Sequence, residues 1–308
     1  MPSFQGCPGV RNTRLAGASL LFRNARRYGK LRALTRPADS PARADLLARY
    51  RAEGATHHGL LRDGRLLRLS AAPWDGGVQT GARDDPEAVQ FLAPCAPSKI
   101  ICIGLNYIEH VRESLTLTGA KEPPKEPLFF FKPPSSALGS GGEIEHPGEG
   151  QRLDPEGEVA IVIGKRARRV PLEAALDHIA GITAFNDVSA RDWQKSDGQW
   201  ARAKGCDTFA PFGPVIALGV SPLDVGFELR VNGEVRQKAR TSGMHFGPAF
   251  LVYHLSRYLT LEPGDVIATG TPAGIAPIEP GDHVEVEVEG VGVLANRVIA
   301  APTGEAHA

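Results

Sequence analysis

The stretch "LDPEGEVAIVIG" at residues 153–164 places two glutamates ahead of a continuous apolar run. Glu156 and Glu158 are two residues apart, so on a β-strand both side chains point to the same face. The run from Val159 to Ile163 is typical of a strand buried on both sides. Two carboxylates on one face repel each other unless a cation or a proton compensates them. The alternative is that both simply face water at a strand end.

The composition is that of an ordinary globular protein of 308 residues, with 42% apolar and 23% charged residues and a formal net charge of zero. A balanced charge does not support nucleic acid or a membrane surface as a partner. No apolar run approaches the roughly 18 residues that a membrane-spanning helix needs. The 35 glycines and 25 prolines favour many turns, and therefore short strands over a helical bundle.

The four cysteines stand at positions 7, 95, 102 and 206, without a C-x-x-C motif. They indicate reduced thiols and a cytoplasmic location, not a disulfide framework or a zinc site.

The N-terminal segment is unusual because residues 1–38 carry eight Arg or Lys and no acidic residue. Such a segment can be an organelle transit peptide. It can equally be a flexible basic extension, or sequence read from a start codon upstream of the true one, and we favour these two alternatives. Residues 1–48 are therefore assigned to a basic extension, disordered or not native, without a role in the chemistry.

A hairpin signal opens the folded part of the chain. "HHGLLRDGRLLRLS" at 57–70 has two apolar segments around Asp63-Gly64, a dipeptide that favours a tight β-turn. The Pro-containing stretch "LAPCAPSK" follows and closes this region. We therefore predict a small β-rich N-terminal domain over 49–97 and a larger domain over 98–302.

The larger domain carries many strand signals and few helix signals. Buried strands are predicted at "IICIG", "LFFF", "VAIVIG" and "PVIALG", a second hairpin at "LRVNGEVRQ", and a half-buried strand at "DHVEVEVEGVGV". Helices are predicted for "PLEAALDHIAG" at 171–181 and for the segment that begins at Pro248. The predicted class is a β-rich α+β fold, not a doubly wound α/β fold.

A third acidic residue follows another apolar stretch, in "ITAFNDVSARD". With Glu156 and Glu158, Asp187 would complete an all-oxygen ligand set, which Mg²⁺, Mn²⁺ or Ca²⁺ prefer. On its own, Asp187 is more often a turn residue or a helix cap.

Two further segments could carry chemistry. In "IGLNYIEHVRES", His110 and Glu113 are neighbours if the stretch is helical, and a carboxylate beside an imidazole makes a general base. In "GQWARAKGCDTFAPFGP", Lys204 lies among apolar residues, where a buried ammonium could stabilise an oxyanion or an enolate. The alternatives are a surface His–Glu pair and a solvated lysine on a loop.

The stretch "LEPGDVIATGTPAGI" predicts a tight turn after a strand. Its backbone N–H groups at Gly270, Thr271 and Gly274 and the threonine hydroxyl would be free to bind an anion such as a carboxylate. No Gly-Lys-Ser/Thr follows and no G-x-G-x-x-G opens a helix, so nucleotide binding is not expected.

Seven fragments in order carry a resemblance to a known family: "NYIEHVRE", "FFFKPPSS", "DPEGEVAIVIG", "NDVSARDWQ", "GQWARAKGCDTFAPFGP", "VNGEVRQ" and "PGDVIATGTPAG". Together they resemble the fumarylacetoacetate hydrolase family over about residues 98 to 300. The hairpin at 57–70 also looks like the small N-terminal domain of many bacterial members. Ala276 in "GTPAGIA" and His245 in "TSGMHF" depart from the usual pattern and leave the substrate open.

The resemblance implies mixed β-sheets rolled around a metal site, usually in a homodimer. Glu156, Glu158 and Asp187 match the positions that hold Mg²⁺ or Mn²⁺. His110 and Glu113 match the dyad that activates water, on a segment that typically closes over substrate, and Lys204 matches a position that polarises substrate oxygens. The substrate-binding positions that the resemblance implies are Gln194, Thr271, Gly270 and Tyr107.

The predicted activity is divalent-metal-dependent hydrolysis of a C–C bond in a 2,4-dioxo acid of the acylpyruvate type, through a metal-bound enolate. The alternative is an isomerase or decarboxylase of a 2-hydroxymuconate-type or 2-oxo dicarboxylic acid, because these reactions share the enolate. His110 and Glu113 favour hydrolysis, since isomerisation needs no activated water. A non-catalytic protein whose metal only ties strands together is a second alternative.

Overall fold

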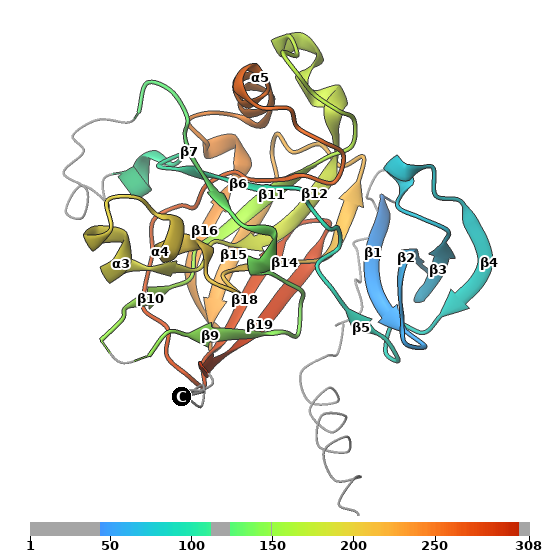
Figure 1. The fold of residues 1–308 in the computed structure, drawn as a ribbon, viewed down its shortest axis with the longest axis horizontal. Coiled ribbons are helices and arrows are strands. Elements are labelled where there is room, and N and C mark those ends of the chain that lie inside the picture. Colours follow the sequence, from blue (N-terminus) through green and yellow to red (C-terminus); the bar gives the residue numbers. More distant parts are fainter. Residues whose placement is uncertain (1–43, 112–123, 149, 302–308) are drawn as a thin grey trace, which may run out of the picture. The chain divides into compact units, whose positions relative to one another are not determined.

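The computed structural model describes residues 44–111, 124–148 and 150–301. Within these ranges the chain is built from strands with few and short helices, so the predicted β-rich α+β class is confirmed (Figure 1). None of the described helices combines the length and apolar character that a membrane crossing requires. Most of the predicted basic extension lies outside the described residues.

The main sheet contains twelve strands in the order β4-β3-β2-β1-β14-β12-β11-β17-β6-β7, with β5 beside β1 and β8 beside β14. Neighbours are antiparallel except for the β17–β6 and β14–β8 pairs, so the sheet is mixed. The bounds are β1 Asp45–Ala52, β2 Ala55–Arg62, β3 Arg65–Leu69, β4 Gln79–Asp84, β5 Gln90–Phe91, β6 Ile100–Gly104, β7 Leu128–Lys132, β8 Ala137–Leu138, β11 Gly157–Ile163, β12 Ile179–Asn186, β14 Ala210–Leu218 and β17 Val266–Ala268.

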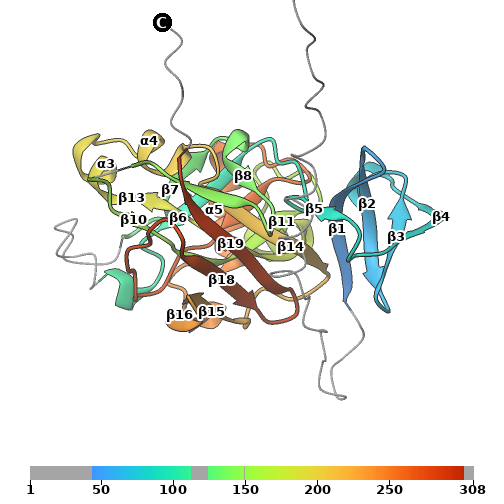
Figure 2. The ribbon, with the colours of Figure 1, turned by 90° about the horizontal axis from the view of Figure 1, so that it is seen from below.

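A second sheet of five strands has the order β16-β15-β18-β19-β9, and β10 and β13 form a separate pair. Figure 2 shows β18 and β19 beside β15 and β16. The bounds are β9 Glu143–His146, β10 Leu153–Asp154, β13 Ser189–Ala190, β15 Gly226–Val231, β16 Glu234–Arg240, β18 His283–Val288 and β19 Gly292–Ala300.

Strand β11 is buried on both faces, as its apolar run predicts. Val159 and Ile161 belong to the core cluster that also contains Val286 and Leu294 of the second sheet. Ala160, which points to the opposite face, belongs to a different apolar cluster. The two sheets therefore share a core, and β11 lies between two apolar layers.

The helices are short apart from α5. Among the described residues, 108–111 are helical, the other α-helices are α3 Arg191–Ser196, α4 Ala201–Gly205 and α5 Pro248–Tyr258, and the 3-10 helices are η1 Pro73–Asp75, η2 Pro134–Ser136, η3 Leu172–His178 and η4 Thr241–Gly243. The helix predicted at Pro248 is confirmed. The one predicted over 171–181 is a 3-10 helix instead, because the chain turns extended at Ile179 to begin β12.

Both predicted hairpins are confirmed. Asp63 and Gly64 join β2 to β3, and Asn232 and Gly233 join β15 to β16. All four residues have positive φ, as the tight turns require. The alternating segment near the C-terminus was predicted as one strand but forms two, β18 and β19, which fold back on each other.

The N-terminal strands continue the main sheet. β1 pairs with β14, with Leu46 opposite Ala217 and Leu47 opposite Ile216. β1 begins at Asp45, so the boundary placed at 48 falls inside this strand. Within the described part of the chain, strand hydrogen bonds thus run from the N-terminal region to the strands that carry the acidic residues.

Candidate metal centre and active site

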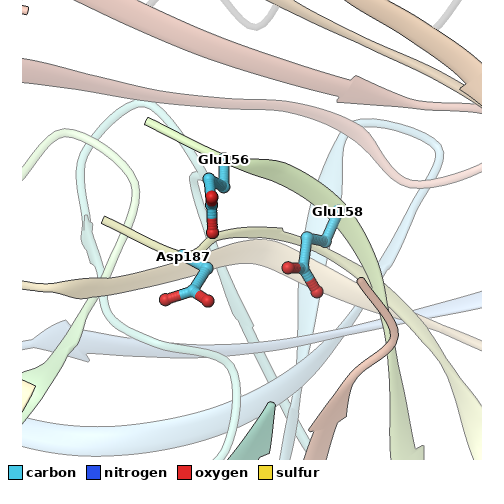
Figure 3. Close-up of side chains that lie close together, drawn as sticks. All are labelled: Glu156, Glu158 and Asp187. Carbon is cyan, nitrogen blue, oxygen red and sulfur yellow. The ribbon is translucent and has the colours of Figure 1, made fainter. Parts of the chain in front are cut away.

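The ends of two neighbouring strands bring the three predicted acidic residues together. β11 pairs with β12 so that Gly157 lies opposite Asn186, which makes Glu156 and Asp187 neighbours. The Asp187 N–H donates to the Glu156 carbonyl at 2.8 Å. One carboxylate oxygen from each of Glu156, Glu158 and Asp187 lies within 4.8 Å of the others (Figure 3). All three residues are buried, so the alternative of water-exposed glutamates is wrong.

Buried amide side chains hold the backbone at this point. Asn186 accepts from the Glu156 N–H at 3.0 Å, and Gln237 accepts from the Gly157 N–H at 2.8 Å. The Gln237 amide also donates to Thr271 and to the Pro272 carbonyl, each at 2.8 Å. β16 therefore links the start of β11 to the turn that follows β17.

Lys204 lies in α4 and reaches two of the three carboxylates. Its Nζ is 2.7 Å from Glu156 Oε2 and 2.8 Å from Asp187 Oδ2. The ammonium is also 5.1 Å from the centre of the Phe130 ring. Burial works against the charge, but Asp187 and Glu156 outweigh it and raise the pKa of Lys204. The buried ammonium beside negative charge that the sequence predicted is present, and the solvated alternative is wrong.

Lys132 is a second buried lysine, whose place at the site was not predicted from the sequence. Its Nζ donates to the carbonyls of Val188, Lys204 and Phe209 at 3.0, 2.6 and 2.7 Å. The same nitrogen is 2.7 Å from Asp187 Oδ1, as an ion pair. Since three carbonyls take the ammonium hydrogens, this contact acts chiefly through charge. Lys132 thus joins β7 to Asp187 and to the backbone of Lys204.

Arg191 was also missed, although it stands in the quoted "NDVSARDWQ". Its Nη2 is 2.5 Å from Glu156 Oε1, and its Nε is 2.8 Å from Asp154 Oδ2. Its Nη1 donates to Gln194 Oε1 at 2.8 Å. Burial opposes ionisation of Glu156, but Arg191, Lys204 and His110 outweigh it and hold the pKa of Glu156 well below its usual range.

Glu158 differs from the other two carboxylates. Its Oε2 accepts from the Gly270 N–H at 2.7 Å. Among the described residues, no Lys or Arg forms an ion pair with it, while Glu156 and Asp187 each pair with two cations. Burial, and then the charges of Asp187 and Glu156, raise the pKa of Glu158 well above its usual range.

The donor set fits a hard divalent cation. Three buried carboxylates converge, and one of them has no ion-pair partner within the part of the chain that the structure describes. A bound divalent cation would remove the repulsion between Glu158 and its two neighbours. Glu156, Glu158 and Asp187 are the residues that would hold it.

A cavity of about 50 Å³ borders the three carboxylates. His110, which is 6% exposed, lines it from the helical residues 108–111 that follow β6. Gln194, Trp200 and Phe130 line it as well, so charged groups face aromatic rings there. The structure thus brings His110, Lys204 and Gln194 to one cavity with the acidic residues, and the roles expected for them stay predictions.

The turn after β17 differs from its prediction in two respects. Thr271 lines the cavity, but its hydroxyl donates to the Gly157 carbonyl at 3.0 Å and accepts from Gln237. The hydroxyl is therefore not free to donate to an external anion. The Gly270 N–H does bind an anion, and that anion is Glu158 of the chain itself.

Two of the predicted residues, Tyr107 and His245, do not line this cavity. Tyr107 is buried, its hydroxyl donates to the Arg240 carbonyl at 3.3 Å, and it borders a separate groove. His245 is exposed and stacks edge-on against Phe246. Glu113, the partner expected for His110, lies outside the described residues, so the dyad stays a prediction.

Comparison with known proteins places the chain in a family. Residues 99–299 match the model described as fumarylacetoacetate (FAA) hydrolase C-terminal, and residues 46–94 match the one described as Rv2993c-like, N-terminal. The chain belongs to the fumarylacetoacetate hydrolase family. A family relative from Archaeoglobus fulgidus, described as an uncharacterized protein, is 46% identical over 255 residues, 82% of this chain and 96% of the relative.

Relatives with named activities carry out different reactions. The mitochondrial oxaloacetate tautomerase FAHD2A of Bos taurus is 41% identical over 68% of this chain and 70% of its own length. The structure of 2-hydroxyhepta-2,4-diene-1,7-dioate isomerase from Mycobacterium marinum matches with a TM-score of 0.77 and 38% identity, over 84% of this chain and 100% of that one. The structure of maleylpyruvate hydrolase from Sphingobium sp. SYK-6, in complex with manganese(II) and pyruvate, matches with a TM-score of 0.68 and 27% identity, over 83% of this chain and 99% of that one.

Proposed function

We propose that this chain is a divalent-metal-dependent enzyme that acts on a small 2-oxo acid through its enolate. The observation that carries the proposal is the buried Glu158, which has no ion-pair partner among the described residues and lies beside Glu156 and Asp187 on the wall of a cavity that also holds Lys204 and His110. Mg²⁺ or Mn²⁺ suits this all-oxygen donor set. The manganese and pyruvate bound to the Sphingobium relative support both the metal and the substrate class.

The charges of the site favour an anionic substrate. Glu156, Glu158, Asp187 and Asp154 face four cations: the buried Lys132 and Lys204, and Arg191 and Arg152, which both pair with Asp154. A divalent cation added to these balanced groups leaves a surplus of positive charge. A substrate carboxylate would balance it, and Arg191 and Gln194 at the cavity wall are placed to orient that carboxylate.

The chain's own residues supply the proton transfer and the charge stabilisation. A bound divalent cation would contribute Lewis-acid stabilisation of the substrate oxygens. The Lys204 ammonium would stabilise negative charge on an oxygen of the enolate. His110 would hold or accept a proton at the cavity, and Phe130 and Trp200 would limit the access of water.

For the overall reaction we propose hydrolysis of a 2,4-dioxo acid, because His110 lines the cavity where it could activate water. Water would lose a proton to His110 and add to the distal carbonyl. The C–C bond would then break, and its electron pair would become the enolate of the 2-oxo acid. Protonation of that enolate gives a carboxylic acid and a 2-oxo acid.

Tautomerisation or isomerisation is the second candidate, with decarboxylation as a related reaction. It is supported by the similarity to an oxaloacetate tautomerase and a dienedioate isomerase, both more similar in sequence than the maleylpyruvate hydrolase. These reactions need the enolate but no activated water. We also propose that the chain forms a homodimer, as the family resemblance implies.

Product analysis by NMR separates the two candidates. Protein with Mg²⁺ would be given an acylpyruvate, oxaloacetate and a hydroxymuconate-type dienol. We expect acid plus pyruvate from the acylpyruvate, with kcat lowered roughly 10²- to 10⁴-fold by His110→Ala. His245→Ala, a histidine outside the cavity, is the matched control and should change the rate little. Turnover of the dienol or oxaloacetate that survives His110→Ala would instead establish the second candidate.

The alternative of a non-catalytic protein that is stabilised by metal is tested by combining this assay with thermal melting. Under this alternative, melting with and without chelator would show a large stabilisation by metal, and the NMR assay would show no turnover of any substrate. That combination would reject the proposed enzyme activity while leaving the metal site in place.

A further inference from the structure

Nearly every carboxylate oxygen of the site already has a donor or a cation beside it. Arg191 holds Glu156 Oε1 and Lys132 lies at Asp187 Oδ1, while Lys204 holds Glu156 Oε2 and Asp187 Oδ2. Gly270 N–H holds Glu158 Oε2. A metal that takes one oxygen from each carboxylate must therefore take oxygens that a cationic side chain now holds.

Lys204 is the cation best able to give way. Arg191 is also anchored by Asp154, and Lys132 is anchored by three backbone carbonyls. The hydrogen bonds of the Lys204 ammonium within the described residues go to Glu156 and Asp187, both of them proposed metal ligands. It is also the one cation in this part of the chain that bridges two of the three carboxylates.

We propose that Lys204 is a built-in competitor of the metal, so that metal loading exchanges its ammonium for the divalent ion at the oxygens of Glu156 and Asp187. This inference rests on the metal site of the proposed function. Without metal, the ammonium compensates the two carboxylates and its hydrogens are committed to them. With metal bound, those hydrogens are released toward the cavity, where a substrate oxygen can accept them.

The exchange has two consequences. The ammonium lowers the affinity of the carboxylates for the metal, because two positive charges compete for the same oxygens at contact distance. It also ties the availability of the lysine to the loading of the site, since the donor is set free only when the divalent ion has arrived. Lys204 would thus lower the affinity of the site for the metal and supply a hydrogen-bond donor to the substrate once the metal is bound.

Isothermal titration of the metal-free full chain with Mn²⁺ tests the exchange without any substrate. We expect Lys204→Met and Lys204→Gln to bind Mn²⁺ at least tenfold more tightly than the wild type, and Lys204→Arg to stay within about threefold, because it keeps the charge. Lys99→Met is the matched control, since Lys99 pairs with the buried Asp265 at 2.5 Å and does not line the cavity. Its Mn²⁺ affinity should equal that of the wild type.

The outcomes separate this inference from the proposed function. If the wild type binds no Mn²⁺, the metal site itself is wrong and the exchange falls with it. If the wild type binds Mn²⁺ but the Met and Gln variants bind it equally or more weakly, the exchange is wrong and the metal site stands. The circular dichroism spectrum of each variant shows whether it is folded, and the Gln variant serves if the Met variant is not.

Discussion

Glu158→Gln should make the metal-free protein more stable and at the same time inactive. Glu158 is buried beside Glu156 and Asp187, and burial with these two charges raises its pKa. A glutamine keeps the shape and can still accept from the Gly270 N–H, but it carries no charge. At pH 8 we expect the free energy of unfolding to rise by roughly 1–3 kcal/mol. Activity should fall roughly 10³-fold or more, since a metal ligand is lost.

Glu156→Gln is the contrasting control because the surroundings of Glu156 lower the pKa of its carboxyl, whereas those of Glu158 raise it. Arg191 and Lys204 pair with this carboxylate and lower its pKa. Removing its charge should therefore destabilise the metal-free protein by roughly 3–5 kcal/mol. Urea denaturation of both variants in the presence of chelator gives the two values. A Glu158→Gln variant that is less stable than the wild type would contradict the view that this carboxylate is uncompensated.

Lys132→Met should be strongly destabilising. The substitution removes the donor from three backbone carbonyls and the compensating charge from Asp187 in a place without exposure to water. Breaking a buried ion pair from one side costs roughly 3–5 kcal/mol. Urea denaturation measures this loss.

Lys238→Met is the surface control for that measurement. The Lys238 side chain is 75% exposed and lies 3.3 Å from Glu228. Such pairs contribute about 0–1 kcal/mol. Equal losses for the two lysines would show that the burial of Lys132 does not govern its contribution.

Much of the site could be predicted because it depends on local periodicity. The two-residue spacing of Glu156 and Glu158, followed by an apolar run, is enough to predict one face of a buried strand. The two hairpins follow from the conformation that Asp-Gly and Asn-Gly adopt. These features depend on only a few neighbouring residues, so they can be predicted from a short stretch of sequence.

The features that were missed depend on long-range contacts. Lys132 meets Val188 and Lys204 across 56 and 72 residues of sequence. The sequence around Lys132, at the end of an apolar strand, does not indicate that its ammonium contacts three carbonyl oxygens and a carboxylate oxygen from distant segments. The Thr271 hydroxyl was expected to be free because nothing near it in the sequence points to the Gly157 carbonyl, 114 residues away.

The pairing of β1 with β14 has a consequence for any shortened form of this chain. β14 has β12 on one side and β1 on the other, and Leu47 of β1 is fully buried in the same apolar cluster as Ile216. A chain without residues 44–97 would leave the N–H and carbonyl groups around Ile216 and Ala217 as an open sheet edge flanked by uncovered apolar side chains. Open edges of this kind recruit strands from other molecules and lead to aggregation. The N-terminal strands therefore protect the solubility of the domain that carries the site.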